Sequence, residues 1–267
     1  MNTGRLIFAQ LLDFFPMHEF NRCVRRYRGD FHCRSLTCYE QFLCLAFAQL
    51  TGCESLRQIE TCLEAMEPKL YHAGLRAAPA RSTLADANEK RPWEIFADFA
   101  HVLIREAVEL YAGEEFGEEL KQMAYALDST TIDLCLALFP WAKFRRHKAA
   151  IKLHTLLDLH GCIPTLVIIT SGKVHDVNIL DQLVCEAGAF YGTSENAVKT
   201  QIWIAISVYV LVAIIKKRLH LSHSLYTILQ ILNVTLFEKM PISTALFDVG
   251  PNIDTVDGCN QLQLFDL

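Results

Sequence analysis

The chain has 267 residues, of which 52% are hydrophobic and 21% charged, and its net charge at pH 7 is −5. This length allows one large domain or two modest ones, and this hydrophobic content excludes an intrinsically disordered chain. The net charge conceals two mildly basic regions: residues 1–34 hold six basic against three acidic residues, and residues 121–176 hold seven against four. Residues 93–120 carry eight acidic residues and one basic one. This pattern is compatible with contact to nucleic acid.

The ten cysteines form neither a metal-binding nor a disulfide pattern. The sequence has no C-x-x-C pair, and no zinc module has the spacing of the run Cys33, Cys38, Cys44, Cys53, Cys62. Several cysteines lie in apolar helical patterns, where Cys behaves as a small hydrophobic residue. The N-terminal segment contains Asp13 and has no cleavage site of a secretory signal. We therefore expect reduced thiols and a cytoplasmic protein.

The first 75 residues are predicted to be helical. Apolar residues at helical spacing precede Pro16, which ends the first helix. Thr37-Cys-Tyr-Glu40 is a capping box that opens a second helix, Gly52 ends it, and Ser55 begins a third. Two helices joined by a short turn can form a DNA-binding helix-turn-helix or can simply belong to a helical bundle. Both interpretations remain open at this point.

Two further helices are predicted before the character of the sequence changes. Arg81-Ser-Thr83 is expected to cap a helix over residues 84–90, which ends before Pro92. A long helix is predicted from Trp93 to Tyr111, followed by an acidic surface stretch.

Beyond the acidic stretch the sequence predicts strands. The segment Met123–Thr131 is predicted to be a strand with Asp128 at its end, and a basic loop, Lys143–Lys148, follows. The runs Ile151–Leu159 and Ile163–Thr170 are rich in residues that favour strands. His160-Gly161 separates them, which predicts a β-hairpin with a two-residue turn.

Asp128 is the candidate metal ligand. A metal-dependent nuclease needs two or three carboxylates, because they share two divalent ions roughly 4 Å apart. The other acidic residues of this region are more simply explained as turn or surface residues: Asp133, Asp158, Asp176 and Asp181. A lone carboxylate binds Mg²⁺ weakly, because the ion keeps its waters.

Three histidines of the same region could also be metal ligands or general bases. None of His147, His154 and His175 has metal-binding spacing with another. His154 alternates with apolar neighbours and is predicted to be buried by packing. His147 belongs to the basic loop, whose cations suit phosphate groups.

The C-terminal part returns to helix. A helix is predicted at 177–184, and the residues after Ala189-Phe-Tyr191 begin a helix cap where a further strand would be expected. The almost wholly apolar run 202–215 is either a buried core helix or, despite being shorter than the roughly 20 residues that span a bilayer, a membrane segment. We favour the core helix. Ser224–Lys239 is predicted to be an amphipathic helix.

With these segments placed, the chain resembles the insertion-sequence transposases of the DDE superfamily, in the type-four branch with a Y-R-E-K signature. Several motifs that span most of the chain carry the resemblance: Arg81-Ser-Thr-Leu-Ala-Asp-Ala-Asn88, Leu127-Asp-Ser-Thr-Thr-Ile-Asp-Leu134, Phe144-Arg-Arg-His-Lys148, Lys152-Leu-His-Thr-Leu-Leu-Asp-Leu159, Ser171-Gly-Lys-Val-His-Asp-Val-Asn178 and the helix from Ala197.

The resemblance implies an RNase H-like catalytic domain behind a DNA-binding region, and cleavage and strand transfer of DNA with Mg²⁺ or Mn²⁺. Asp128 matches the first catalytic carboxylate and metal ligand. DNA contacts are expected from Arg81, Ser82, Thr83, Arg145, Arg146, His147 and Lys148. The second Asp of the family, in an Asp-x-Gly-Tyr motif, is missing, as is the helix with the Tyr, Arg, Glu and Lys. We interpret this as an internal deletion that joins two similar Ala-Phe-Tyr stretches.

The expected fold class is α+β, in four parts: a DNA-binding-like helical region (1–80), a helical connector (81–120), a truncated RNase H-like sheet domain (121–191) and C-terminal helices with a tail (192–267). The expected function is that of a DNA transposase that has lost catalysis. Its expected partner is DNA, and it is expected to act as a homo-oligomer or together with an intact transposase. No membrane partner is expected. The alternatives are a non-catalytic DNA-binding inhibitor, a membrane-associated protein and an inert remnant that folds poorly, because its apolar helix would lack part of its cover.

Overall fold

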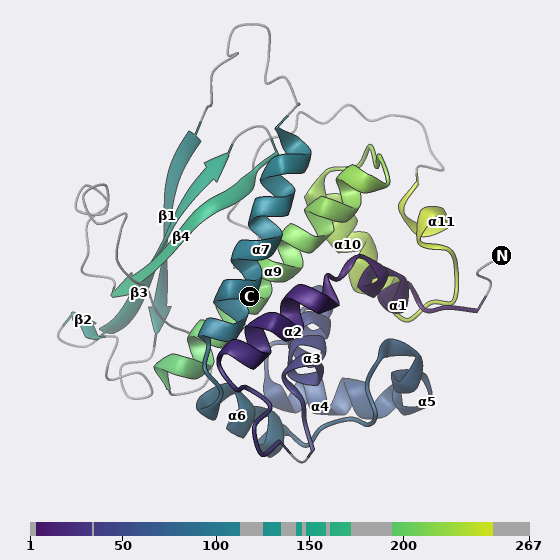
Figure 1. Cartoon of the computed structure of the whole chain (residues 1–267), viewed down its shortest axis with the longest axis horizontal. Helices are drawn as coiled ribbons and strands as arrows, with labels where there is room; N and C mark the ends of the chain where they lie inside the picture. The colour runs from purple at the N-terminus through teal and green to yellow at the C-terminus, as the bar shows by residue number, and fades with distance from the viewer. Residues whose placement is uncertain are drawn as a thin grey trace, which may run out of the picture.

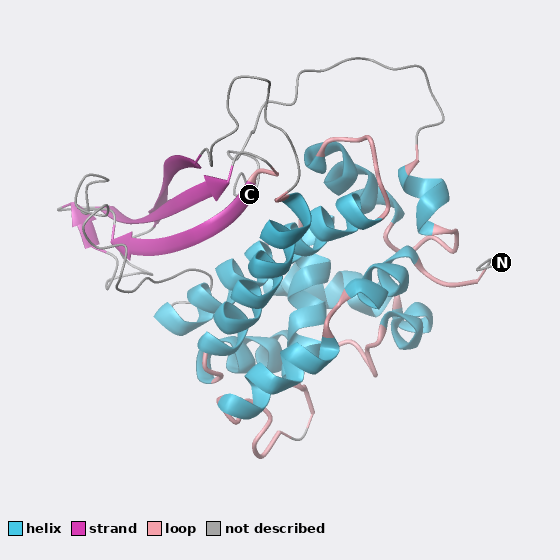
Figure 2. Cartoon of the chain, turned by 45° about the horizontal axis from the view of Figure 1, so that its top comes forward, coloured by secondary structure: helices cyan, strands magenta, loops and turns pink. Residues whose placement is uncertain are grey.

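The computed structural model describes residues 4–33, 35–112, 125–134, 143–145, 148–158, 161–171 and 194–247. The chain is of the α+β class, with a helical body and an antiparallel sheet beside it (Figures 1 and 2). The helices within these residues are α1 (Ile7–Leu11), α2 (Met17–Arg26), α3 (Cys38–Thr51), α4 (Leu56–Ala65), α5 (Glu67–Leu70), α6 (Arg81–Lys90), α7 (Glu94–Tyr111), α9 (Glu195–Arg218), α10 (Leu225–Thr235) and α11 (Ile242–Leu246), with 3-10 turns at Leu12–Phe14 and Tyr71–Ala73.

Helices α3 and α4 begin where local sequence signals predict. Thr37 Oγ1 accepts a hydrogen bond from the amide of Glu40, and the Glu40 carboxylate accepts one from the Thr37 amide, which completes the predicted capping box of α3. Gly52 ends α3 in the left-handed conformation, with φ 64°. Ser55 caps α4 through the amide of Gln58. These local predictions are confirmed.

The sheet has β3 at its centre. The strands are β1 (Tyr125–Leu134), β2 (Lys143–Arg145), β3 (Lys148–Asp158) and β4 (Ile163–Ser171), and β3 pairs antiparallel with the other three. The predicted hairpin is therefore confirmed as β3–β4, but its loop is longer than predicted. Asp158 pairs with Ile163, so four residues connect the strands, and the last of them, Cys162, is left-handed, with φ 52°.

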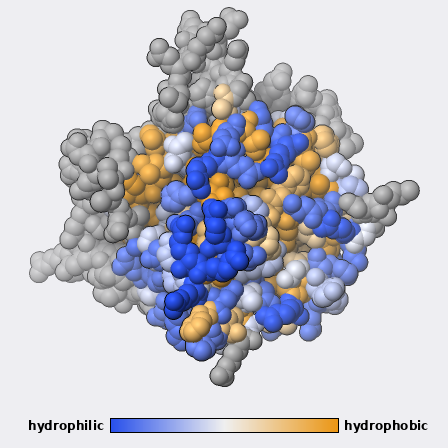
Figure 3. Space-filling model, in the orientation of Figure 1, coloured by the Kyte–Doolittle hydropathy of each residue, from blue (hydrophilic) through white to orange (hydrophobic). Residues whose placement is uncertain are grey.

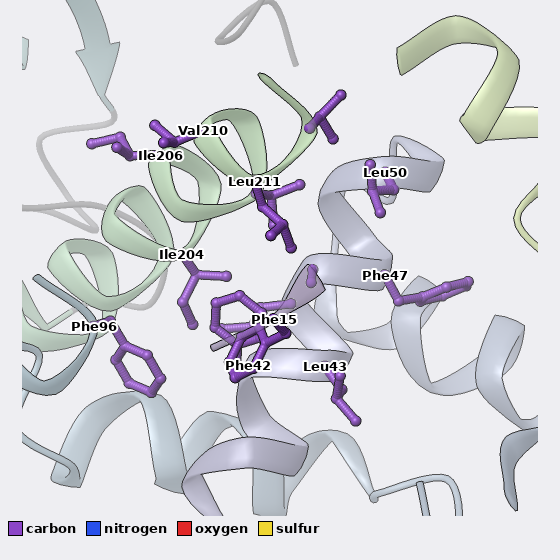
Figure 4. Packing of buried hydrophobic residues seen from close by; sticks show 14 of the residues in the cluster. Phe15, Phe42, Leu43, Phe47, Leu50, Phe96, Ile204, Ile206, Val210 and Leu211 are labelled. Atoms are coloured by element: carbon purple, nitrogen blue, oxygen red, sulfur yellow. The ribbon is translucent and has the colours of Figure 1, made fainter. Parts of the chain in front are cut away.

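Helix α9 is the central helix of the hydrophobic core. Its buried residues face α3, α6, α7 and α10, and Figure 4 shows Ile204, Ile206 and Leu211 of α9 in the same cluster as Phe42 of α3. Its length and composition would allow a membrane span, yet 89% of its most apolar window is buried inside the protein. The core-helix prediction is confirmed. The expectation that this helix lacks cover is wrong, because N-terminal helices supply the cover.

The two ends of the described chain are joined. The amides of Ile7 and Phe8 donate to the carbonyls of Glu238 and Leu236, at 3.1 and 3.0 Å. The Gln10 side chain donates to the carbonyl of Met240 at 2.7 Å. The hydrophobic core is consequently continuous from the first helix to α11, which the sequence did not predict as a helix.

Most cysteines that the structure describes have free thiols, as expected: Cys23, Cys33, Cys38, Cys44, Cys53 and Cys62. Burial raises the pKa of the Cys44 thiol to about 12, which suits a cysteine that acts as a core residue. Cys162 departs from the expectation of reduced thiols, because it is disulfide-bonded.

Candidate functional site

Asp128 lies within a strand rather than at its end. It is the fourth of the ten residues of β1, and its register partner is Thr155 of β3. Directly opposed positions share a face of the sheet. Position 128 therefore shares a face with Thr155 and with its partner Val167 on β4, both of which are buried. This face packs on the helical body, since Val167 belongs to the same hydrophobic core as residues of α7 and α9.

The carboxylates that the structure describes do not converge on position 128. Asp133 lies five positions further along β1, which places it on the opposite face. Asp158 ends β3, three positions beyond Thr155, and Asp176 and Asp181 lie outside the described residues. Helix α9 contains one carboxylate, Glu195, which is exposed and pairs with Lys199 at 3.1 Å. Within the described ranges no group of three His, Cys, Asp or Glu residues could hold a metal. These residues do not fit a two-metal site.

His154 is a packed residue, as predicted. It is 1% exposed, and its Nε2 lies 3.0 Å from Oγ1 of Thr170 on the neighbouring strand. His147 and His175 lie outside the described residues.

The basic loop lies at the end of the sheet. Arg145 at the end of β2 is the register partner of Lys148 at the start of β3, so the chain reverses over two residues. Those two residues, Arg146 and His147, lie outside the described part of the chain. The reversal brings the backbones at positions 145 and 148 opposite each other.

The expected cap formed by Arg81, Ser82 and Thr83 is not observed. Ala80 is the N-cap of α6, and the three residues form the first turn of the helix, without a side-chain cap. The Arg81 amide is satisfied instead by the Glu60 carboxylate of α4, at 2.9 Å. Arg81 and Ser82 are exposed. They belong to the helical body, whereas β2 lies at an outer corner of the sheet (Figure 1).

Asn88, the last residue of the motif Arg81–Asn88, belongs to a buried polar network that the sequence did not predict. Gln41 Nε2 of α3 donates to Asn88 Oδ1 of α6 at 2.7 Å, and Arg91 donates to Gln41 Oε1 at 2.9 Å. Asn196 Nδ2, at the start of α9, donates to the carbonyls of Asn88 and Arg91 at 2.8 and 2.6 Å. Asn88 therefore holds α3, α6 and α9 together, which is a structural role.

A second feature was also missed: the exposed arginines of α2. Arg22, Arg25 and Arg26 lie opposite the buried Phe20 and Val24. The signal was available in the sequence, because buried and basic residues alternate there at helical spacing.

Comparisons with known proteins identify two parts of the chain. Residues 3–76 match a family model described as a domain of unknown function (DUF4372). Residues 119–189 match the model described as "Transposase DDE domain". A protein named "Putative transposase y4zB", from Sinorhizobium fredii (strain NBRC 101917 / NGR234), is 32% identical over 133 residues, which are 49% of this chain and 35% of that protein. No solved structure matches. These findings together support an insertion-sequence transposase.

Proposed function

We propose that the chain derives from a DNA transposase of the type-four, Y-R-E-K branch, and that it binds the DNA at the ends of an insertion sequence. The observation that carries the proposal is Asp128 on β1, inside the segment 119–189 that is similar to a transposase DDE domain. The order of the three long antiparallel strands, β1–β3–β4, fits the first part of an RNase H-like sheet. The proposal includes the domain boundaries expected near residues 80, 120 and 191.

We further infer that this copy has lost catalysis through an internal deletion. Ser194 already caps α9, so only two residues separate Tyr191 from the cap of a long helix. A family member has the second Asp and then the Glu ligand in this part of the chain. The only carboxylate on α9 is the exposed Glu195, and α10 has none. Asp128 would then be the sole remaining ligand for Mg²⁺ or Mn²⁺, which one carboxylate holds weakly.

DNA contact is proposed for both groups of residues identified in the sequence, Arg81 to Thr83 and Arg145 to Lys148, because cations and hydroxyl groups bind phosphates. A chain that binds element ends without cleaving them would act in the cytoplasm as an inhibitor, alone, as a homo-oligomer or with an intact transposase. An inert remnant is the remaining alternative.

A gel assay tests this proposal. Purified protein is mixed with DNA that flanks its own gene, with Mg²⁺ or Mn²⁺, and Asp128→Ala is compared with Asp133→Ala on the same strand. We expect a shifted band without cleavage for all three proteins.

Cleavage that disappears in Asp128→Ala alone would show a complete site and would refute the deletion. Neither a shift nor cleavage, from protein with a helical circular-dichroism spectrum, would favour the inert remnant and would refute the proposed DNA binding.

A further inference from the structure

Helix α2 and the turn that follows it form an exposed basic surface, here called the α2 surface. The inward side of α2 is anchored on α7 by Phe20, Cys23 and Val24, which are buried. The outward side is exposed, and Figure 3 shows the most hydrophilic residues gathered over α2. The surface consists of Arg22, Arg25, Arg26, Arg28, Phe31 and His32.

Two arginines of the α2 surface are compensated by acidic neighbours, and two are not. Arg22 pairs with Glu19 at 2.6 Å, and Arg26 pairs with Asp98 of α7. Arg25 and Arg28 are exposed, and neither has an ion-pair partner among the residues that the structure describes. These two guanidinium groups retain their full capacity to bind an anion.

The turn after α2 has an unusual backbone. Arg28 and His32 adopt left-handed conformations, with φ 52° and 58°, which residues other than glycine rarely do. Gly29 lies between them, and a Cβ there would lie 2.4 Å from Cδ1 of Ile95 on α7. Asp30 Oδ1 accepts a hydrogen bond from the Cys38 amide of α3, at 2.7 Å. The turn is therefore anchored to two helices of the core and presents a fixed shape to solvent.

The tip of the turn exposes an aromatic ring. Phe31 is 67% exposed, and its ring centroid lies 4.1 Å from that of His32. Strained backbone persists only where the surroundings impose it, and such strain is concentrated at functional sites. Here the strained turn directs an apolar ring outward, beside two uncompensated cations. Phosphate-binding cations beside an aromatic ring are the combination that contacts a nucleic-acid backbone and its sugars or bases.

We propose that the α2 surface binds the backbone of DNA. Arg25 and Arg28 contact phosphates, and Phe31 stacks on an unpaired base. This inference rests on the proposed function for its substrate, and it adds a contact surface outside α6 and the basic loop. Charge complementarity favours this occupant, because residues 1–34 hold six basic against three acidic residues, and Arg25 and Arg28 have no ion-pair partner among the described residues.

The test measures DNA affinity of the full chain by fluorescence anisotropy, with a labelled duplex from the DNA that flanks its gene. The variant is Arg25→Gln with Arg28→Asn, because asparagine tolerates the left-handed conformation and the fold is preserved. Its matched control is Arg57→Gln with Lys239→Gln, two exposed cations elsewhere. We expect the α2 variant to bind roughly tenfold or more weakly. We also expect its slope of log affinity against log salt to fall by about 1.8, or about 0.9 for each phosphate that the variant no longer neutralises. The control should bind as the wild type does.

Three outcomes would overturn the inference. If the wild type binds DNA and the α2 variant binds it with the same affinity and salt slope, the α2 surface is not a DNA contact, and the proposed function is unaffected. If the wild-type protein binds no DNA, both the α2 surface as a DNA contact and the proposed DNA-binding function are refuted. Stronger competition by an RNA duplex than by a DNA duplex of the same sequence would reassign the surface to RNA.

For Phe31→Ala, we expect a larger loss of affinity on DNA with an unpaired overhang than on blunt DNA, and equal losses would contradict the role of the ring.

Discussion

Glu40 is a nearly buried carboxylate whose removal should destabilise the N-terminal helices. Its Oε1 accepts a hydrogen bond from Arg76 Nε at 2.6 Å. Its Oε2 accepts from Arg76 Nη2 at 2.7 Å, and from both the amide and the hydroxyl of Thr37 at 2.9 Å. Each of these partners is a hydrogen-bond donor. Glu40→Gln keeps the shape of the side chain but turns an NH₂ group toward one of these donors.

The expected loss follows from the pKa of Glu40. Burial acts to raise it, but the hydrogen bonds from Arg76 and Thr37 outweigh burial and hold it at about 2, below the usual 4.5. A difference of this size corresponds to about 3 kcal/mol between the two protonation states. The Arg76 side chain is 64% exposed, so solvent screens part of the interaction. We expect Glu40→Gln to lower the free energy of unfolding by roughly 2 kcal/mol at pH 7.

The sign of the pH dependence is fixed by the depressed pKa. The contribution of Glu40 is fully present above its unfolded pKa of 4.5 and is lost as the pH falls toward 2. Urea unfolding followed by circular dichroism should therefore show the gap between wild type and variant shrinking over this range. Glu64→Gln, an exposed residue of α4, is the control and should stay within about 0.5 kcal/mol. A gap that does not shrink on acidification, or one no larger than that of the control, would refute the reasoning.

Two further changes test how the sheet and α9 are held on the helical body. In Gly161→Ala, the new Cβ would lie 2.4 Å from the Tyr111 ring, so we expect a loss of about 1–3 kcal/mol in thermal unfolding. This loss should diminish in a Tyr111→Leu background, and an equal loss there would exclude the clash as its cause. Asn196→Ala removes the hydrogen bonds to the carbonyls of Asn88 and Arg91. It should cost about 1–2 kcal/mol in urea unfolding, and wild-type stability would show that water replaces both bonds.

Local signals predicted the elements whose ends are satisfied locally. Thr37, Ser55, Ser194 and Ser224 each cap a helix through the amide three residues beyond, as the sequence indicates. The predicted start of α6 was wrong, because the first amide of this helix is not satisfied by a nearby residue in the sequence. The Arg81 amide is satisfied by Glu60, a partner from another helix, and no local pattern indicates it.

Tertiary contacts also account for the other errors. Gly161 suggested a two-residue turn, but the approach of the Tyr111 ring explains the glycine, and Cys162 rather than Gly161 is left-handed. For the candidate site, the sequence identified Asp128 from the strand that carries it. The exposed turn after α2 was missed, because the left-handed conformations of Arg28 and His32 depend on how the turn is anchored to α3 and α7.

The fold of the helical body does not depend on the strands that we propose were deleted. The apolar face of α9 is covered by α3, α6, α7 and α10, and Asn196 and the Tyr111 hydroxyl bind it to its neighbours. The sheet packs on α9 through β4, and the Tyr209 hydroxyl donates to the Cys162 carbonyl at 3.2 Å. Deleting strands beyond β4 would therefore remove metal ligands without uncovering the core. A chain of this kind can lose cleavage and keep a folded surface for DNA, because the proposed α2 surface is supported by helices outside the deleted part.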